Sequence, residues 1–88
     1  MAYKPEWYEV VWELGAEDSE HTQLFQPIQR PNAAALYAQK QLEVSTVPCS
    51  NVRMYLTHTN KPYDLLHSMY HMADGSTMED GYDSKRSI

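Results

Sequence analysis

Apolar and polar side chains alternate along three short segments of this chain, and this period of two is typical of half-buried β-strands. Residues 7–14 (WYEVVWEL) put their even-numbered side chains on one face and their odd-numbered side chains on the other. Residues 51–59 (NVRMYLTHT) alternate in the same way. The remaining segment, 22–28 (TQLFQPI), contains Pro27, which lacks the N–H that a ladder hydrogen bond needs. We therefore predict three strands, and we place 22–28 at a sheet edge.

Two further segments are predicted to be helical. Asn32 is a suitable N-cap for a helix over 33–44, because its side chain can accept a hydrogen bond from an unpaired backbone N–H. The small apolar stripe of this helix would pack closely on a sheet, and Lys40 would point elsewhere. The stripe comprises Ala34, Ala35, Ala38 and Leu42. In 62–74 (PYDLLHSMYHMAD), apolar residues recur at helical spacing, and the Gly75 that follows is a natural stop.

The resulting order of elements is β-β-α-β-α. It predicts an α+β fold with a small three-stranded antiparallel or mixed sheet and two helices packed mainly on one face. Because the chain has only 88 residues, we expect a single domain over 1–74. Residues 75–88 show no period and little apolar content, so we expect them to form a flexible C-terminal tail.

The charge of the chain restricts its possible functions more than its possible folds. The net charge is −5, and half of the twelve acidic residues fall within the first twenty positions. Nucleic-acid affinity depends mainly on cationic contacts to phosphate, so we expect no direct nucleic-acid binding. An acidic surface of this kind suits a basic protein partner instead.

Cysteine content and hydropathy indicate a cytoplasmic protein. The single Cys49 excludes an internal disulfide and fits a reducing compartment. No apolar run approaches the roughly 18–20 residues that a membrane span requires. The first ten residues also lack the basic-then-apolar order of a secretion signal, so we expect no membrane association.

His67 and His71 are the best candidates for metal ligands. On a helix, a spacing of four would bring both imidazoles to one face, as in two-histidine metal sites, and Asp64 and Asp74 would lie on the same arc. A solvated polar face explains the same pattern without a metal, and no glutamate follows the first histidine as it does in the metalloprotease motif. We therefore predict no metal and no cofactor, with a metal-dependent catalyst as an alternative.

No residue pattern indicates covalent catalysis. Cys49 could act as a nucleophile with His58 or His21 as its base, but it follows a proline in a turn, where a structural thiol is the simpler interpretation. Three glycines in the whole chain do not make a phosphate-binding loop. We predict that the protein is not an enzyme.

Aromatic residues are too numerous to be buried together in so small a fold. If helices cover only one face of the sheet, Trp7 forms an exposed strip with Glu9 and Glu13, because alternation places it opposite Trp12. Tryptophan and tyrosine are frequent anchors of protein interfaces. The alternative is that both tryptophans pack beneath helices.

Four short stretches carry a resemblance to a known family. DSEHT (18–22), QPI (26–28), AALYA (34–38) and TVP (46–48) precede a strand in an order that is similar to the small inhibitors of host RNA polymerase made by short-tailed coliphages. The resemblance spans about residues 7–59 and implies docking on the largest polymerase subunit through arginines of the third strand. Here only Arg53 fills that role, with Tyr55 near it, and residues 62–88 have no counterpart.

Together these observations predict a small acidic protein-binding module, phage-encoded and located in the host cytosol, that inhibits a host enzyme. Bacterial RNA polymerase is the first candidate. A viral structural or assembly component remains an alternative, with weak self-association through the edge strand. The expected partner-binding residues are Trp7, Glu9, Glu13, Glu17, Asp18, Glu20, Phe25, Arg53 and Tyr55.

Overall fold

All three segments with a period of two form strands, and two strands that we did not predict join them. The computed structural model describes residues 7–57 and 64–81. Its strands are β1 (Trp7–Glu13), β2 (His21–Phe25), β3 (Ser50–Thr57), β4 (Asp64–His71) and β5 (Thr77–Gly81). A short 3₁₀ helix, η1 (Pro27–Gln29), leads into the helix α1 (Arg30–Thr46). The α+β class is confirmed, whereas the predicted three-stranded sheet with two helices is wrong.

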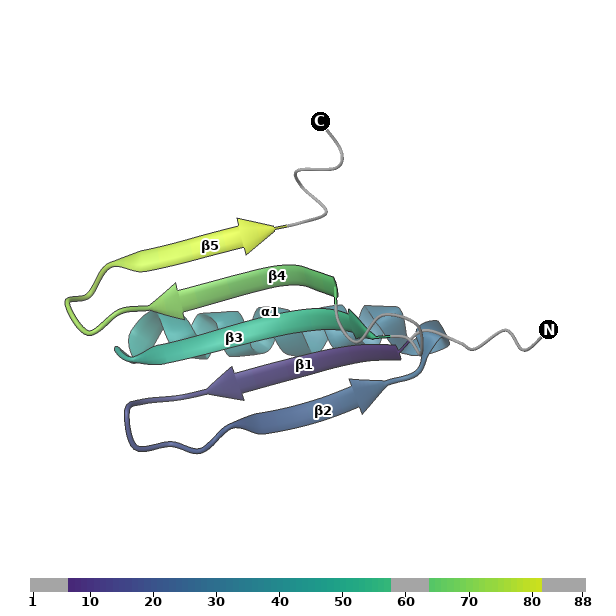
Figure 1. Cartoon of the computed structure of the whole chain (residues 1–88), viewed down its shortest axis with the longest axis horizontal. Coiled ribbons are helices and arrows are strands. Elements are labelled where there is room, and N and C mark those ends of the chain that lie inside the picture. Colours follow the sequence, from purple (N-terminus) through teal and green to yellow (C-terminus); the bar gives the residue numbers. More distant parts are fainter. Residues whose placement is uncertain (1–6, 58–63, 82–88) are drawn as a thin grey trace.

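One antiparallel sheet contains all five strands in the order β2-β1-β3-β4-β5. The two edge strands are therefore β2 and β5, which lie at the bottom and the top of Figure 1. Helix α1 lies behind the sheet in that view, and it packs mainly on β1 and β3. The other sheet face has no element of the described chain across it.

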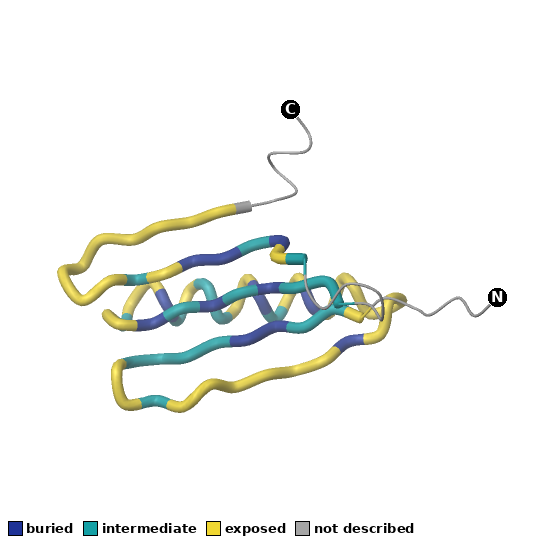
Figure 2. Tube along the Cα trace, viewed as in Figure 1, coloured by how far each residue is buried: buried dark blue, intermediate teal, exposed yellow. Residues whose placement is uncertain are grey.

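The hydrophobic core lies between α1 and the three inner strands, where the buried segments of Figure 2 are concentrated. From the sheet, this core takes the even-numbered side chains of β1 and β3, as their alternation predicts. From the helix, the core takes Ala33, Tyr37 and Val44, which follow one another at intervals of one turn and two turns. Its buried members are Val10, Phe25, Ala33, Tyr37, Val44, Val52, Met54, Leu66 and Met69.

Pro27 ends the second strand rather than interrupting it. Strand β2 stops at Phe25, and Pro27 is placed within the first turn of η1, where a missing N–H costs nothing. Gln26, the residue before η1, stabilises the start of this helix by donating its backbone N–H to Gln29 Oε1 at 2.9 Å. The predicted extension of the strand to residue 28 is therefore wrong, although β2 is an edge strand as expected.

Helix α1 covers its predicted range but buries a different stripe. Its buried residues are Ala33, Tyr37 and Val44, whereas Leu42 from the predicted stripe is 73% exposed. Lys40 also lies on the sheet side, with its ammonium 4.9 Å from the centre of the Trp12 ring. The helix has no wide apolar face of its own, so packing against the sheet decided its rotation. Asn32 is also not the N-cap, because the helix begins at Arg30.

Most of the segment predicted as the second helix is strand β4, Asp64–His71, and positions 62 and 63 of that segment lie outside the described residues. A register shift opposite Met54 and Tyr55 leaves Leu66 as an extra residue, since Met54 pairs with His67 and Tyr55 with Leu65. This β-bulge allows Leu66 and Met69 to reach the same core although they are three residues apart. Apolar residues spaced by three imitate a helical period, and that imitation explains the error.

The predicted flexible tail contains another strand. Residues Thr77–Gly81 form β5, which pairs with β4 through a turn closed by the Gly75 N–H on the Met72 carbonyl at 3.0 Å. Gly75 has a φ of +93°, so it serves a turn between strands rather than a helix end. Residues 82–88 of that tail, and positions 58–59 of the predicted third strand, lie outside the described residues.

Candidate functional site

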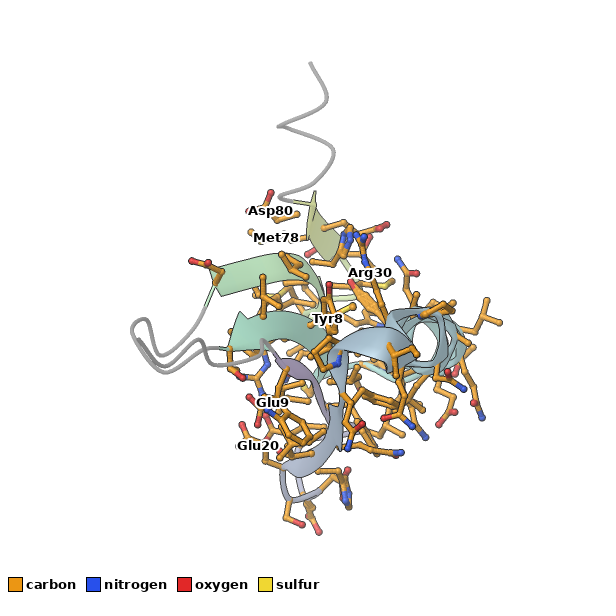
Figure 3. All side chains as sticks on the ribbon, turned by 90° about the vertical axis from the view of Figure 1, so that its right-hand side faces the viewer. Tyr8, Glu9, Glu20, Arg30, Met78 and Asp80 are labelled. Carbon is orange, nitrogen blue, oxygen red and sulfur yellow. The ribbon has the colours of Figure 1, made fainter. Side chains whose placement is uncertain are left out.

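The sheet face opposite α1 is the candidate site, and we call it the uncovered face. It consists of the side chains that alternate away from the helix on each strand, and the antiparallel register places them in rows across the sheet. In Figure 3, Glu9, Glu20, Met78 and Asp80 lie on this side of the ribbon, whereas Tyr8 and Arg30 lie on the helix side. Its members are Trp7, Glu9, Val11, Glu13, Glu20, Thr22, Leu24, Asn51, Arg53, Tyr55, Thr57, Leu65, Ser68, Tyr70, Met78 and Asp80.

Five large apolar or aromatic side chains of the uncovered face reach solvent. They are Trp7, Leu24, Leu65, Tyr70 and Met78, with exposed fractions between 37% and 62%. Exposed apolar residues are ordinary when they are scattered singly, but here they share one face of one sheet. The strand register places Trp7, Leu24 and Leu65 toward one end of the face and pairs Tyr70 with Met78 at the other, so the face presents two apolar groups that a partner could bury.

Arg53 lies at the centre of the uncovered face and joins four of its neighbours. Its guanidinium donates a hydrogen bond to Glu20 Oε2 at 2.8 Å and lies 3.9 Å from Glu13 Oε1. It also donates to Asn51 Oδ1 at 3.0 Å and to the Tyr55 hydroxyl at 3.4 Å. Burial tends to lower the pKa of Arg53, but its hydrogen bonds to Glu20 and Tyr55 outweigh burial and raise it. The guanidinium is therefore a fixed positive charge.

A hollow of about 190 Å³ lies beside this network, above Val11. Glu9 and Glu20 form part of its wall, together with Thr22, Arg53 and Tyr55. Burial and, to a smaller extent, repulsion from Glu20 raise the pKa of Glu9, and the charge of Arg53 opposes the shift. Arg53 is hydrogen-bonded to Glu20, so its positive charge compensates Glu20 more fully than Glu9. A cation placed in the hollow would therefore stabilise the ionised carboxylate of Glu9.

Six of the nine predicted partner-binding residues lie together on the uncovered face. They are Trp7, Glu9, Glu13, Glu20, Arg53 and Tyr55. Alternation along β1 was sufficient to group Trp7, Glu9 and Glu13, whereas the pairing of β1 with β3 brings Arg53 and Tyr55 to the same face.

The other three predicted residues lie elsewhere. Phe25 is 6% exposed and belongs to the core beneath α1, so it is not part of the uncovered face. Glu17 and Asp18 lie in the turn between β1 and β2. Asp18 closes that turn by accepting a hydrogen bond from the Leu14 backbone N–H at 2.9 Å. This bond, and a further one with His21, lower the pKa of Asp18, which identifies the residue as part of the turn structure.

Sequence reasoning missed the part of the uncovered face that β4 and β5 supply. Leu65, Tyr70 and Met78 were assigned to a helix or to a tail, so their common face was not visible. The available signal was the alternation of Ser68 and Tyr70 with Met69 and His71, which begins only after the bulge.

His67 and His71 do not form a metal site with each other. They are four residues apart on a strand, which separates their Cα atoms by about 13 Å, too far for one ion to bridge. His71 Nδ1 lies 2.8 Å from the Val44 carbonyl oxygen, so it must donate to it, and the ring ties β4 to the end of α1. Within residues 7–57 and 64–81, no group of three or more histidine, cysteine, aspartate or glutamate side chains is placed to hold a metal ion.

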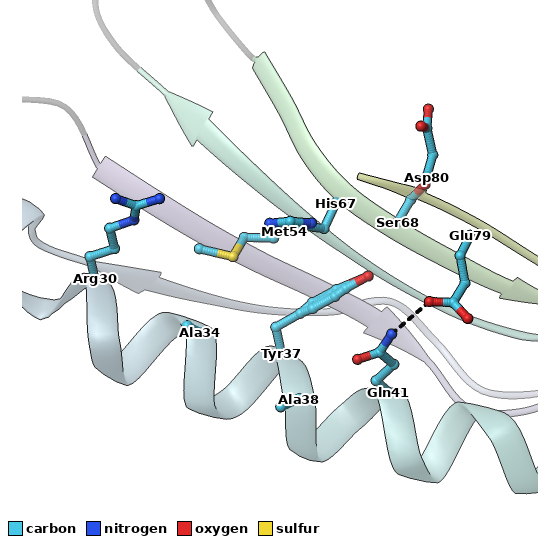
Figure 4. Close-up of a pocket in the computed structure, with 10 residues that line it drawn as sticks. All are labelled: Arg30, Ala34, Tyr37, Ala38, Gln41, Met54, His67, Ser68, Glu79 and Asp80. Carbon is cyan, nitrogen blue, oxygen red and sulfur yellow. Dashed lines mark hydrogen bonds between the residues drawn. The ribbon is translucent and has the colours of Figure 1, made fainter. Parts of the chain in front are cut away.

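A second concave feature, a cleft of about 430 Å³, lies on the helix side between α1 and strands β4 and β5 (Figure 4). Gln41 donates to Glu79 across one end of it at 3.0 Å. Tyr37 points into the cleft, where burial and then the charge of Glu79 raise its pKa to about 12. Its hydroxyl therefore stays protonated at neutral pH. The centre of the His67 ring lies 5.6 Å from the centre of the Tyr37 ring, and the two rings are tilted against each other.

Comparison of the chain with protein-family models, with curated proteins and with solved structures finds no match in any of the three. Across the described part of the chain, no helix is long and apolar enough to cross a membrane.

Proposed function

We propose that this protein is a small binding module that docks its uncovered face on a basic surface of another protein and thereby inhibits it. The observation that carries the proposal is the composition of that face. Exposed apolar anchors such as Trp7 and Tyr70 lie beside carboxylates that outnumber the single guanidinium of Arg53. Such a face offers apolar burial for affinity and unbalanced charge for faster association.

Distribution of positive charge supports a basic partner. The described residues contain three lysines and arginines, and each contacts a neighbour of the same chain. Arg53 binds Glu20 and Glu13, Lys40 lies over Trp12, and Arg30 lies over the Tyr8 ring at 5.9 Å. Carboxylates outnumber these cations among residues 7–57 and 64–81, and the whole chain has a net charge of −5, which favours the approach of a basic protein.

Inhibition requires no chemistry by this chain. A module of this size can exclude a substrate or hold its partner in an inactive arrangement by occupying a surface. The proposed setting is a bacterial cytosol entered by a phage, and the proposed first target is host RNA polymerase, as the resemblance of residues 7–59 implies.

The test measures binding to purified bacterial RNA polymerase core enzyme with the immobilised full-length chain. Trp7→Ala is expected to raise the Kd by about 30-fold, or about 2 kcal/mol, as for other aromatic interface anchors. Tyr70→Ala is expected to weaken binding in the same direction. Circular dichroism would verify that both variants retain the fold.

Leu42→Ala is the matched control, because Leu42 is an exposed apolar residue on the side of α1 that faces away from the sheet. It should leave the Kd within twofold of wild type. Equal losses for Leu42→Ala and Trp7→Ala would contradict docking through the uncovered face. Failure of the wild-type chain to bind at micromolar concentration would contradict this target.

A further inference from the structure

The two edges of the sheet differ in how they are protected against pairing with another strand. Natural proteins block exposed edges with charged side chains, proline or bulges, because an edge presents unpaired backbone N–H and C=O groups. Strand β5 carries two adjacent carboxylates, Glu79 and Asp80, and Glu79 is also bonded to Gln41. Strand β2 (HTQLF) has no lysine, arginine, aspartate, glutamate, proline or glycine.

The outer side of β2 is open within the described structure. β2 pairs with β1 alone, and its residues from His21 to Leu24 are all exposed. Five residues of antiparallel strand span about 17 Å, which is enough to pair a short extended segment. The turn at Pro27 limits the edge at one end, so the length of a paired segment would be defined.

Charge beside β2 determines which segment fits. Thr22 and Leu24 are the β2 residues on the uncovered face, and Thr22 forms part of the hollow that Glu9 and Glu20 border. A strand added next to β2 would place alternate side chains on this face, and a lysine or arginine there would meet these carboxylates. A second copy of the chain would instead add another molecule with a net charge of −5.

We propose that the edge of β2 binds an extended, basic segment of the partner as a sixth strand, with lysine or arginine side chains directed toward Glu20 and Glu9. Main-chain hydrogen bonds would supply affinity, and the alternate basic side chains would supply specificity, as in other cases of strand addition. This inference rests on the proposed function, because it describes how the same partner would continue from the uncovered face around the edge of the sheet.

The experiment uses the ¹⁵N-labelled full-length chain and a capped heptapeptide that alternates lysine with valine or threonine. Titration is expected to shift the backbone amides of residues 21–25 more than those of β5. The same peptide with glutamate in place of lysine should bind at least tenfold more weakly. Two alternately N-methylated versions of the lysine peptide should differ, because a paired strand directs only one of its two N–H rows toward β2.

Thr22→Lys should reduce peptide affinity at least tenfold by placing a charge on the edge. Thr77→Lys, the same substitution on the opposite edge and outside the uncovered face, should leave it within twofold. Equal loss with both N-methylated peptides, or equal effects of the two lysine variants, would overturn strand addition. Shifts of the β2 amides with protein concentration alone would assign the edge to a second copy and also overturn it.

These outcomes are separable from those of the proposed function. Shifts centred on Trp7 and Tyr70 rather than on residues 21–25 would refute the edge site while leaving docking through the uncovered face intact. Specific pairing at β2 by a chain that does not bind the polymerase would refute the target and leave the edge site intact.

Discussion

The two faces of the same sheet bury their central side chains by different means. On the helix side, Val10 and Val52 are fully buried because α1 lies across them. On the uncovered face, Val11 is only 4% exposed although no described element crosses it. Neighbouring polar side chains shield it instead, namely Thr22 and Arg53, which lie opposite Val11 on the two adjacent strands.

Because of this difference, the helix side of the sheet stabilises the fold, and the uncovered face is available for binding. Burial beneath α1 removes apolar area from water permanently and is expected to supply most of the folding free energy. The uncovered face keeps apolar groups such as Tyr70 and Met78 partly in water, where a partner can still bury them. Substitutions of one residue type on both faces therefore provide the sharpest tests.

The largest expected difference concerns two methionines. Met54 on the helix side is 3% exposed, and Met78 on the uncovered face is 62% exposed. Met54→Ala should lower the free energy of unfolding by about 2–5 kcal/mol, because it leaves a cavity in the core. Met78→Ala should change it by no more than about 0.5 kcal/mol. Urea denaturation of both variants measures the two values, and similar losses would refute the contrast between the faces.

A smaller effect is expected from the network on the uncovered face. Arg53→Ala removes the hydrogen bonds to Glu20 and Asn51 and uncovers Val11, so a loss of about 1–2 kcal/mol is expected. Part of this loss should diminish at high salt, because it is electrostatic. The control is Arg30→Ala at the exposed start of α1, which should cost less. A larger loss for Arg30→Ala would show that the Arg53 network does not stabilise this face.

The smallest expected effect is a pH dependence of opposite sign at two carboxylates. Burial and Glu20 raise the pKa of Glu9 above its usual value of 4.5, so ionisation of Glu9 opposes folding. Glu9→Gln should therefore be more stable than wild type at pH 7, and its advantage should disappear as the pH falls toward 4.5. Denaturation midpoints measured at several pH values would reveal this trend.

Asp18 provides the opposite case for the same measurement. The Leu14 N–H and His21 lower the pKa of Asp18 below its usual value of 3.8, so its ionised form favours folding. Asp18→Asn should be less stable than wild type at pH 7, and the deficit should shrink as the pH falls below 3.8. If both variants differed from wild type at pH 7 in the same direction, the opposite pKa shifts assigned to Glu9 and Asp18 would be wrong.

Regular alternation made part of the fold predictable from the sequence. Strands β1 and β3 pair without a bulge between them, so each side chain keeps the face that its position indicates, and Trp7, Glu9 and Glu13 could be placed together in advance. The helix after Pro27 was also predictable, because proline and alanine favour a helix start and a helix interior respectively.

Tertiary structure alone decided the rest. The bulge at Leu66 breaks the period of two in β4, and only pairing with β3 shows that the segment is a strand. The rotation of α1 likewise depends on the sheet, since Tyr37 and the stem of Lys40 face it while the more apolar Leu42 points to solvent. Local patterns record the period of a regular element, whereas pairing and packing depend on distant residues that the local pattern does not contain.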